Sequence, residues 1–338
     1  MIDQHTIDVL EYPKVLSLIR EKCITPFGST EVNQFSPLFE LDAIEKRQTE
    51  VSEMVDLIRF GAAFPLSRLE DSRELIGQSR AEGTFLAPEE IRLVLELVEV
   101  SIDLHGYDKE SREKAPHIEE YLSRIRAFVE LKQDIRKAID EDGEIRDSAS
   151  RELKRIRNDL RSTKSKIISR LESILGSQRK QPGWQDDVVT QRNGRYVIPV
   201  LAGNYKSEEG ILHDRSQSGA TFFVEPNVAV ELNNKLNMLA QEERTEIIRI
   251  LKALTAEIAS RADALLENAR LIGTLDAIHA AAGFAVDIHA TRPTMIDRRE
   301  LNLIDARHPL LIKQFGDVKT VIPLSLRLDD DQRAVLIT

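Results

Sequence analysis

Apolar residues in the first 145 positions recur at intervals of three and four, the period of amphipathic α-helices. Such runs extend from Val9 to Ile19 and from Ile44 to Ile58. Another helix is expected from Pro88, because proline suits a first turn and Glu89 and Glu90 face the positive end of the helix dipole. Its expected core positions are Ile91, Leu95, Val98 and Ile102, and a further helical run is Ile118, Leu122, Ile125 and Val129. Residues 1–145 therefore predict a helical core domain.

A narrower apolar seam follows in residues 146–182, with basic residues on the remaining positions. Its members recur at spacings of three and four: Leu153, Ile156, Leu160, Thr163, Ile167, Leu171 and Ile174. Thr163 is the polar member. A seam of this width on one long helix is typical of a coiled coil. We call this expected helix the outgoing lever.

The period changes to that of strands in residues 183–227. Asn193-Gly194 between β-forming residues is the strongest short hairpin signal. A second pair, 211–213 and 221–224, flanks the expected turn Ser216-Gln217-Ser218-Gly219. We expect about four antiparallel strands, which we call the clamp.

Residues 228–300 return to a helical seam, interrupted at Glu243 and then continued into the core. Its apolar members are Leu232, Leu236, Leu239, Ile247, Leu251, Leu254, Ile258, Leu265, Ile272 and Leu275. Two long helices flanking a small sheet bury their seams most simply by running antiparallel, with the sheet at their tip. A helix of about 40 residues would extend about 60 Å. The fold class expected is mainly α.

Residues 301–338 contain three apolar segments that read as strands, at 301–304, 321–322 and 334–338. A buried strand at the end of a chain is unusual. We therefore expect the 338 residues to be part of a longer protein, ending inside an α/β domain.

Composition narrows the function class. The chain is 41% hydrophobic and 31% charged, with a net charge of −10 that argues against nucleic-acid binding when taken alone. The single cysteine, Cys23, excludes a disulfide framework and fits a reducing cytoplasm. No apolar stretch approaches the ~20 residues of a membrane span, and the N-terminal residues do not resemble a signal peptide.

The charge is distributed unevenly. Residues 1–145 carry a net charge of −13 from 18 basic and 31 acidic residues, and residues 181–338 carry −4 from 18 and 22. Residues 146–180 carry +7 from 11 basic and 4 acidic residues. Because the local field governs contact with a phosphate backbone, the lever is the expected site of such contact.

Several motifs in order along the chain resemble those of a known family. They are residues 210–226 followed by 230–234, the opening helix at 10–15, the lever entry at 139–150, the hairpin at 192–200 and residues 306–311. Together they resemble the second MutS subfamily, bacterial MutS paralogues with a C-terminal Smr endonuclease domain. The resemblance covers essentially the whole chain.

The resemblance implies a core, lever and clamp, followed by the start of an ATPase domain at 301–338. Full-length members are dimeric ATPases that use ATP and Mg²⁺. They suppress recombination on branched DNA or act on stalled ribosomes, with ribosomal RNA as the partner. In such relatives the final strand leads into a phosphate-binding loop, whose glycine-rich turn, Lys and Ser/Thr are absent from this sequence. We therefore expect this chain neither to hydrolyse ATP nor to cut nucleic acid, with Val321 and Ile322 as weak adenine contacts.

The candidate nucleic-acid-binding residues lie on the lever and the clamp. Those on the lever are Arg151, Lys154, Arg155, Arg157, Arg161, Lys164, Lys166 and Arg170. Those on the clamp are Arg192, Arg195, Lys206, His213, Arg215, Ser216 and Ser218. Basic and hydroxyl groups at such positions are typical phosphate contacts. Candidates for base stacking are few: Tyr196, Tyr205, Phe222, Phe223 and Trp184.

Each candidate has a structural alternative. The basic side chains could solvate a coiled coil with their stems packed along it, and the serines could stabilise their own turn. The acidic run 140–144 lacks the spacing of a calcium loop and predicts a turn. The scattered histidines predict no metal site. Two hypotheses follow: a nucleic-acid clamp, or a coiled-coil module for dimerisation or for transmitting the ATPase state.

Overall fold

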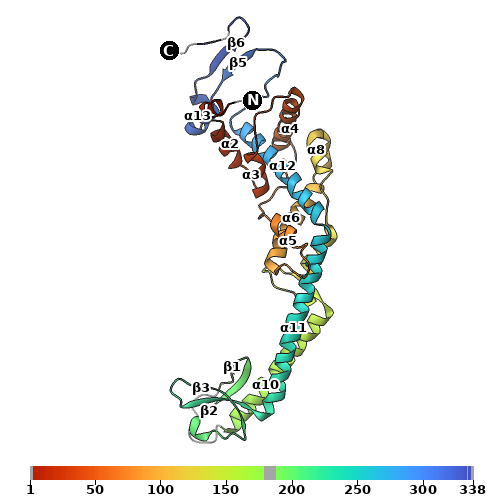
Figure 1. The fold of residues 1–338 in the computed structure, drawn as a ribbon, viewed down its shortest axis with the longest axis vertical. Helices are drawn as coiled ribbons and strands as arrows, with labels where there is room; N and C mark the ends of the chain where they lie inside the picture. The colour runs from red at the N-terminus through yellow and green to blue at the C-terminus, as the bar shows by residue number, and fades with distance from the viewer. Residues whose placement is uncertain (1–2, 179–187, 333, 336–338) are drawn as a thin grey trace. The chain divides into compact units, whose positions relative to one another are not determined.

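The computed structural model describes residues 3–178, 188–332 and 334–335. It divides into two compact units: residues 134–255, and the residues before 134 together with those from 256 onward. We call them the lever–clamp unit and the core unit. Most of the described elements are helices and the sheets are small and antiparallel, so the predicted fold class is confirmed (Figure 1).

The core unit is built on helices from both ends of the chain. They are α1 (Gln4–Val9), α2 (Tyr12–Arg20), α3 (Pro26–Asn33), α4 (Leu41–Phe60), α5 (Arg73–Gln78), α6 (Pro88–His105), α7 (Lys109–Lys114), α8 (Pro116–Leu122) and α12 (Ala262–Asp287). Helix α9 (Val129–Ala138) crosses from this unit into the next. The late helix α12 packs on α3 and α4, so sequence-distant segments share one core.

Helix α12 is apolar on most sides. By length and composition it could cross a membrane, so the expectation that no stretch approaches such a span is wrong; 61% of the relevant window is buried within the protein. A central core helix has this character without meeting lipid. Its buried Asp276 accepts hydrogen bonds from the backbone of Ile24 (3.0 Å) and Thr25 (2.7 Å) and from the Thr25 hydroxyl (2.7 Å). This carboxylate fixes α12 to the start of α3.

A close approach of backbone to Asp276 makes Gly28 sensitive to substitution. A Cβ at this position would lie 2.2 Å from Asp276 Oδ2. We expect Gly28→Ala to lower the free energy of unfolding of the core unit by about 2–3 kcal/mol, because the core would be overpacked. Urea unfolding measures the effect. Gly77→Ala is the matched control, since α5 leaves open space there; an equal loss in both variants would contradict the close approach.

Three details of the core differ from the periodic pattern. In α6 the buried face holds Ile91 and Val98 as expected, but Val94 and Leu97 replace Leu95 and Ile102. The run from Ile118 to Val129 is not one helix, since α8 ends at Leu122 and α9 begins at Val129. Its apolar spacing survives the break because Ile118, Leu122 and Ile125 all remain buried in the shared core. The helix predicted from Val9 to Ile19 is likewise interrupted, between α1 and α2.

The C-terminal elements of the core unit form a two-stranded antiparallel sheet, β5 (Leu301–Ala306) with β6 (Leu324–Leu328). Helix α13 (Pro309–Phe315) and the short 3-10 helix η3 (Val318–Thr320) connect them. The strand expected at 321–322 instead starts at Leu324, because Pro323 follows Ile322 and cannot donate a ladder hydrogen bond. The last expected strand, 334–338, falls mostly outside the described residues; Ala334 and Val335 are not in a strand.

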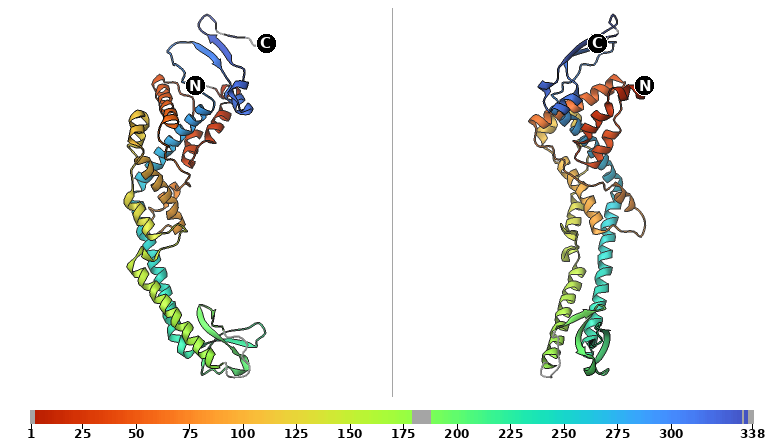
Figure 2. Two further views of the ribbon diagram at one scale, coloured as in Figure 1. Left: turned by 180° about the vertical axis from the view of Figure 1, so that it is seen from behind. Right: turned by 90° about the vertical axis from the view of Figure 1, so that its left-hand side faces the viewer.

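The lever–clamp unit consists of two long helices and a sheet. The 3-10 turn η1 (Asp147–Ala149) leads into α10 (Arg151–Gln178), and α11 (Asn227–Ser260) returns alongside it (Figure 2). Five of the seven predicted seam positions are buried: Leu153, Ile156, Thr163, Ile167 and Leu171. Leu160 and Ile174 are half-buried, and at the end of α10 the buried position is Leu175. Residues 179–182 of the expected lever lie outside the described residues.

The clamp is the predicted four-stranded sheet. Its strands are β1 (Thr190–Arg192), β2 (Arg195–Leu201), β3 (Gly210–Arg215) and β4 (Thr221–Pro226), in the order β1-β2-β4-β3, with η2 (Ala202–Asn204) after β2. Asn193 and Gly194 both have positive φ, as the predicted two-residue turn requires. One face of the sheet packs on the end of α10, where Ile198 and Val224 meet Ile167 and Leu171.

Candidate nucleic-acid interface

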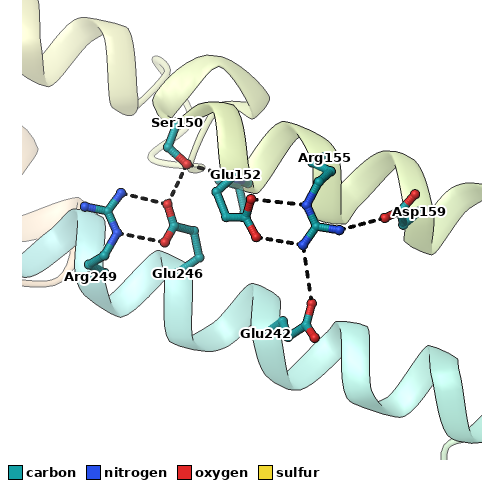
Figure 3. A network of polar contacts seen from close by, with 8 residues as sticks. Ser150, Glu152, Arg155, Asp159, Glu242, Glu246 and Arg249 are labelled. Atoms are coloured by element: carbon teal, nitrogen blue, oxygen red, sulfur yellow. Dashed lines mark hydrogen bonds and ion pairs between the residues drawn. The ribbon is translucent and has the colours of Figure 1, made fainter.

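Polar contacts join the two lever helices along their length. Arg155 of α10 lies 3.8 Å from Glu242 of α11, and Arg157 lies 2.7 Å from Glu243 (Figure 3 for Arg155). Farther along, Arg170 Nη1 donates to the carbonyl of Val228 (3.2 Å). From the Ser150–Glu246 contact at the start of α10 to the Arg170–Val228 contact near its end, the residue number rises on α10 and falls on α11. These contacts establish the antiparallel arrangement that the two seams predict.

Ser150 caps α10 and also ties it to α11. Its hydroxyl oxygen accepts a hydrogen bond from the Leu153 backbone (2.9 Å) and donates one to Glu246 Oε1 (2.6 Å). Arg249 holds Glu246 from the same helix (2.7 Å), as Figure 3 shows. Hydrogen bonds from Arg249 and Ser150 outweigh partial burial and lower the pKa of Glu246 to about 2. Glu246 therefore stays ionised at neutral pH, where it anchors the start of the lever.

Replacing Ser150 by Ala is expected to destabilise the lever–clamp unit by about 1 kcal/mol, because α10 loses its N-cap and Glu246 loses a hydrogen bond. Amide hydrogen exchange in residues 151–153 measures the local effect. Ser165→Ala is the control on the same helix, where the side chain is exposed. Similar exchange rates in the two variants would show that the cap contributes nothing.

Three of the predicted lever arginines are held by acids. Arg155 pairs with Glu152 (2.7 Å) and Asp159 (3.0 Å) of its own helix, which raises the pKa of Arg155 further (Figure 3). Arg157 and Arg161 both pair with Asp147, at 2.8 and 2.9 Å. The basic segment is thus less available to a phosphate than its composition indicates.

Four other cations of α10 are exposed, and their side chains have neither an ion-pair nor a hydrogen-bond partner among the residues that the structure describes. They are Arg151, Lys154, Lys164 and Lys166. Lys154 and Lys164 share a flank with Arg161, because spacings of seven and three return to one side of a helix. Lys166 shares the opposite flank with Arg170, four residues on.

A buried carboxylate organises the clamp. Glu225 of β4 is fully buried and accepts hydrogen bonds from Arg195 (2.7 Å), His213 (2.6 Å) and Asn233 of α11 (2.8 Å). Burial alone would raise the pKa of Glu225, but these hydrogen bonds outweigh it and lower the pKa. Asn233 also bonds both backbone groups of Tyr196. The network ties β2, β3 and β4 to α11.

This network accounts for two of the predicted phosphate contacts. Arg195 and His213 both point their polar atoms at Glu225 and are mostly buried. Glu225 and Asn233 lie within the family-like motif at 210–226 and 230–234, but the sequence pattern indicated no role for either. One feature of the sequence could have indicated the network. An acidic residue ends an apolar strand, and an asparagine follows eight positions later on a helix.

The remaining basic residues of the clamp are more exposed. The Arg192 guanidinium lies over the Phe223 ring (4.2 Å to its centre) and 3.3 Å from Asp214. The Arg215 guanidinium lies over Phe222 at 5.0 Å. Lys206 is exposed, with Glu209 at 3.8 Å. Arg215 is thus held in place by a ring rather than by an acid, and its charge remains accessible.

The loop between β3 and β4 shows the features of the turn alternative. Ser216 Oγ accepts a hydrogen bond from the Thr221 backbone (3.0 Å), Ser218 Oγ accepts one from Ala220 (3.4 Å), and Gly219 has positive φ. The acidic run 140–144 also forms the predicted turn, with Asp140 Oδ1 accepting from the Glu144 backbone (2.9 Å).

The aromatic candidates are engaged in packing. Tyr196, Tyr205, Phe222 and Phe223 are half-buried, and Tyr205 makes an edge-to-face contact with Phe222. Trp184 lies outside the described residues. The described part of the clamp therefore presents charge more than stacking surface.

The two adenine-contact candidates differ sharply. Val321 is buried, and its carbonyl accepts a hydrogen bond from Arg307 (3.2 Å), so it belongs to the local core. Ile322 is 89% exposed. Of the two candidates, only Ile322 has a side chain exposed enough to contact an adenine ring.

Comparison with known proteins places the chain in a family. The family description "MutS domain III" matches residues 7–282, and the chain belongs to the MutS family. Proteins called Endonuclease MutS2 match it along nearly its whole length, which confirms the resemblance to the second subfamily. The protein from Geobacillus sp. (strain WCH70) is 36% identical over 98% of the chain, and that from Finegoldia magna is 34% identical over 100%. The chain spans 42% of the length of each of these relatives.

Proposed function

We propose that the lever–clamp unit binds the phosphate backbone of nucleic acid. The observation that carries the proposal is the set of partner-free, exposed cations on α10: Arg151, Lys154, Lys164 and Lys166. Contacts to phosphate bind without reading sequence and release counterions. The held arginines and the half-buried aromatic rings leave backbone contact as the chemistry this surface supports best.

The partner we propose is branched DNA, or ribosomal RNA on a stalled ribosome. The row from Lys154 to Lys164 spans about 15 Å of helix, and each strand of a duplex carries a phosphate every ~3.4 Å along its axis. One flank of α10 can therefore reach several phosphates. Because such contacts recognise charge and spacing, they suit either polymer.

We also propose that the full-length protein is a cytoplasmic, homodimeric ATPase and endonuclease that uses ATP and Mg²⁺. The name of the relatives supports the nuclease. The 338 residues contain no Gly-x-x-x-x-Gly-Lys-Ser/Thr sequence, so this chain alone is proposed to be non-catalytic. Ile322 is its proposed contact with the adenine ring.

A second function has its own support. Arg157 bridges Asp147 and Glu243, and Arg155 bridges Glu152 and Glu242, so the helices are electrostatically joined. A joined pair could transmit the ATPase state mechanically without touching nucleic acid. The two functions predict different protection of the lysines.

Amine-reactive footprinting separates them. The chain is acetylated with and without a four-way DNA junction, and with and without a ribosomal RNA helix. We expect protection of Lys154, Lys164 and Lys166 but not of the exposed Lys235 and Lys252 of α11. Unchanged reactivity of all five lysines, with both polymers, would favour the purely mechanical function.

A further inference from the structure

The basic row on one flank of α10 is interrupted by an acid. Lys154 and Lys164 at its ends are exposed and partner-free among the described residues, whereas Arg161 between them is engaged. Arg161 Nη2 donates to Asp147 Oδ2 (2.9 Å) and to Asn158 Oδ1 (2.9 Å). Its side chain is nevertheless 63% exposed. The row therefore contains a third cation that is accessible but compensated.

Asp147 contacts two arginines that depend on it unequally. Arg157 also pairs with Glu243 (2.7 Å) and donates to the Ile145 carbonyl (2.7 Å), and it is largely buried. Arg157 therefore keeps its place without Asp147. Arg161 has Asp147 as its charged partner within the described part of the chain, since Asn158 is neutral.

We propose that Asp147 is a built-in restraint on phosphate binding, which competes with nucleic acid for Arg161. This inference rests on the proposed function of the same surface. A phosphate approaching the row must exchange with the Asp147 carboxylate, so Arg161 adds less affinity than its neighbours. Exposed ion pairs are weak and readily exchanged, and therefore the restraint lowers affinity without closing the site.

The charge of Asp147 is constant near neutral pH. Hydrogen bonds from Arg157 and Arg161 hold the pKa of Asp147 below its usual value. The restraint therefore acts at every pH where the lever is expected to work. It sets how tightly the row binds and how steeply binding depends on salt.

Substitution of Asp147 by Asn tests the inference. Asn keeps the shape of the side chain and removes its charge. We expect Asp147→Asn to bind a four-way DNA junction about tenfold more tightly at about 50 mM salt, and the slope of log K against log salt to steepen by about 0.9, the value of one added phosphate contact. Fluorescence anisotropy across a salt series measures both.

Two further variants make the result specific. Glu141→Gln changes net charge equally at an exposed position that pairs with no arginine among the described residues. Arg161→Gln should change binding less than twofold alone but abolish the gain in the Asp147→Asn background, a non-additivity expected of interacting residues. Circular dichroism confirms that each variant is folded.

The outcomes separate this inference from the function beneath it. Junction binding by the unmodified chain with no gain in Asp147→Asn would overturn the restraint and leave the proposed function intact. Equal gains in Asp147→Asn and Glu141→Gln would also overturn it, because net charge alone would then suffice. Failure of both the unmodified chain and Asp147→Asn to bind at low salt would overturn the proposed function itself.

Discussion

Glu225→Gln is expected to lower the free energy of unfolding of the lever–clamp unit by about 3 kcal/mol. The substitution leaves Arg195 and its neighbours facing a neutral amide, and breaking a buried ion pair on one side typically costs about 3–5 kcal/mol. Part of the hydrogen bonding survives, which favours the lower end of that range. Urea unfolding followed by hydrogen exchange at the β4 amides reports on this unit separately from the core.

Acid titration adds a second signature of Glu225. Its pKa is lowered in the folded state, so its stabilising contribution is fully present above the unfolded pKa of about 4.3 and is lost as pH falls through the folded value. As the pH falls below about 5, the free energy of unfolding of the Glu225→Gln variant should therefore decrease less than that of the unmodified chain. Glu209→Gln, at an exposed carboxyl, is the control; the same loss in both variants at neutral pH would refute the buried network.

Reversal of the three partner-free lysines of α10 is expected to have the largest effect on binding. In the variant Lys154→Glu/Lys164→Glu/Lys166→Glu, each phosphate contact becomes a repulsion. We expect junction affinity to fall at least 100-fold at low salt. The salt slope should fall by about 2.7, corresponding to three lost contacts. Because these side chains are exposed, the fold should be preserved.

The matched control places the same charge change on the other lever helix. Lys235→Glu/Arg244→Glu/Lys252→Glu alters three exposed cations of α11. We expect a much smaller loss, because these residues lie on α11 and the proposed phosphate contacts lie on α10. Equal losses in the two triple variants would show that only the overall field of the unit matters, and would remove α10 as the binding surface.

Much of the architecture could be predicted from the sequence because local periodicity and packing agree in the lever. Thr163 illustrates this agreement: it was the polar member of the seam, and it is buried in line with Ile156 and Ile167. The Asn193-Gly194 turn was predictable for a different reason, since few residue pairs tolerate two positive φ angles in succession.

Periodicity did not predict the buried positions and helix ends that depend on packing against distant segments. Leu95 and Ile102 fit the helical spacing of α6, but Val94 and Leu97 are the buried residues because the helix is rotated in its core. Buried apolar residues on α8 and in the loop before α9 have the spacing of a single helix, although α8 ends at Leu122 and α9 begins at Val129.

The candidate interface shows a similar limit. The sequence located a basic segment, but it could not show that Asp147 and Glu243 hold Arg157, since Glu243 is 86 positions away. It likewise grouped Arg195 with the phosphate contacts, whereas a carboxylate 30 positions later holds it. Ion pairing between distant segments distinguishes the available cations from the compensated ones, and this pairing is a property of the folded chain.

The most direct test of the central claim is the salt dependence of junction binding by the unmodified 338-residue chain. Four partner-free cations on α10 predict a slope of log K against log salt near −3.6, at about −0.9 for each phosphate contact. A slope between about −3 and −4 would support binding through this surface. No binding at low salt, or binding with a slope near zero, would contradict it.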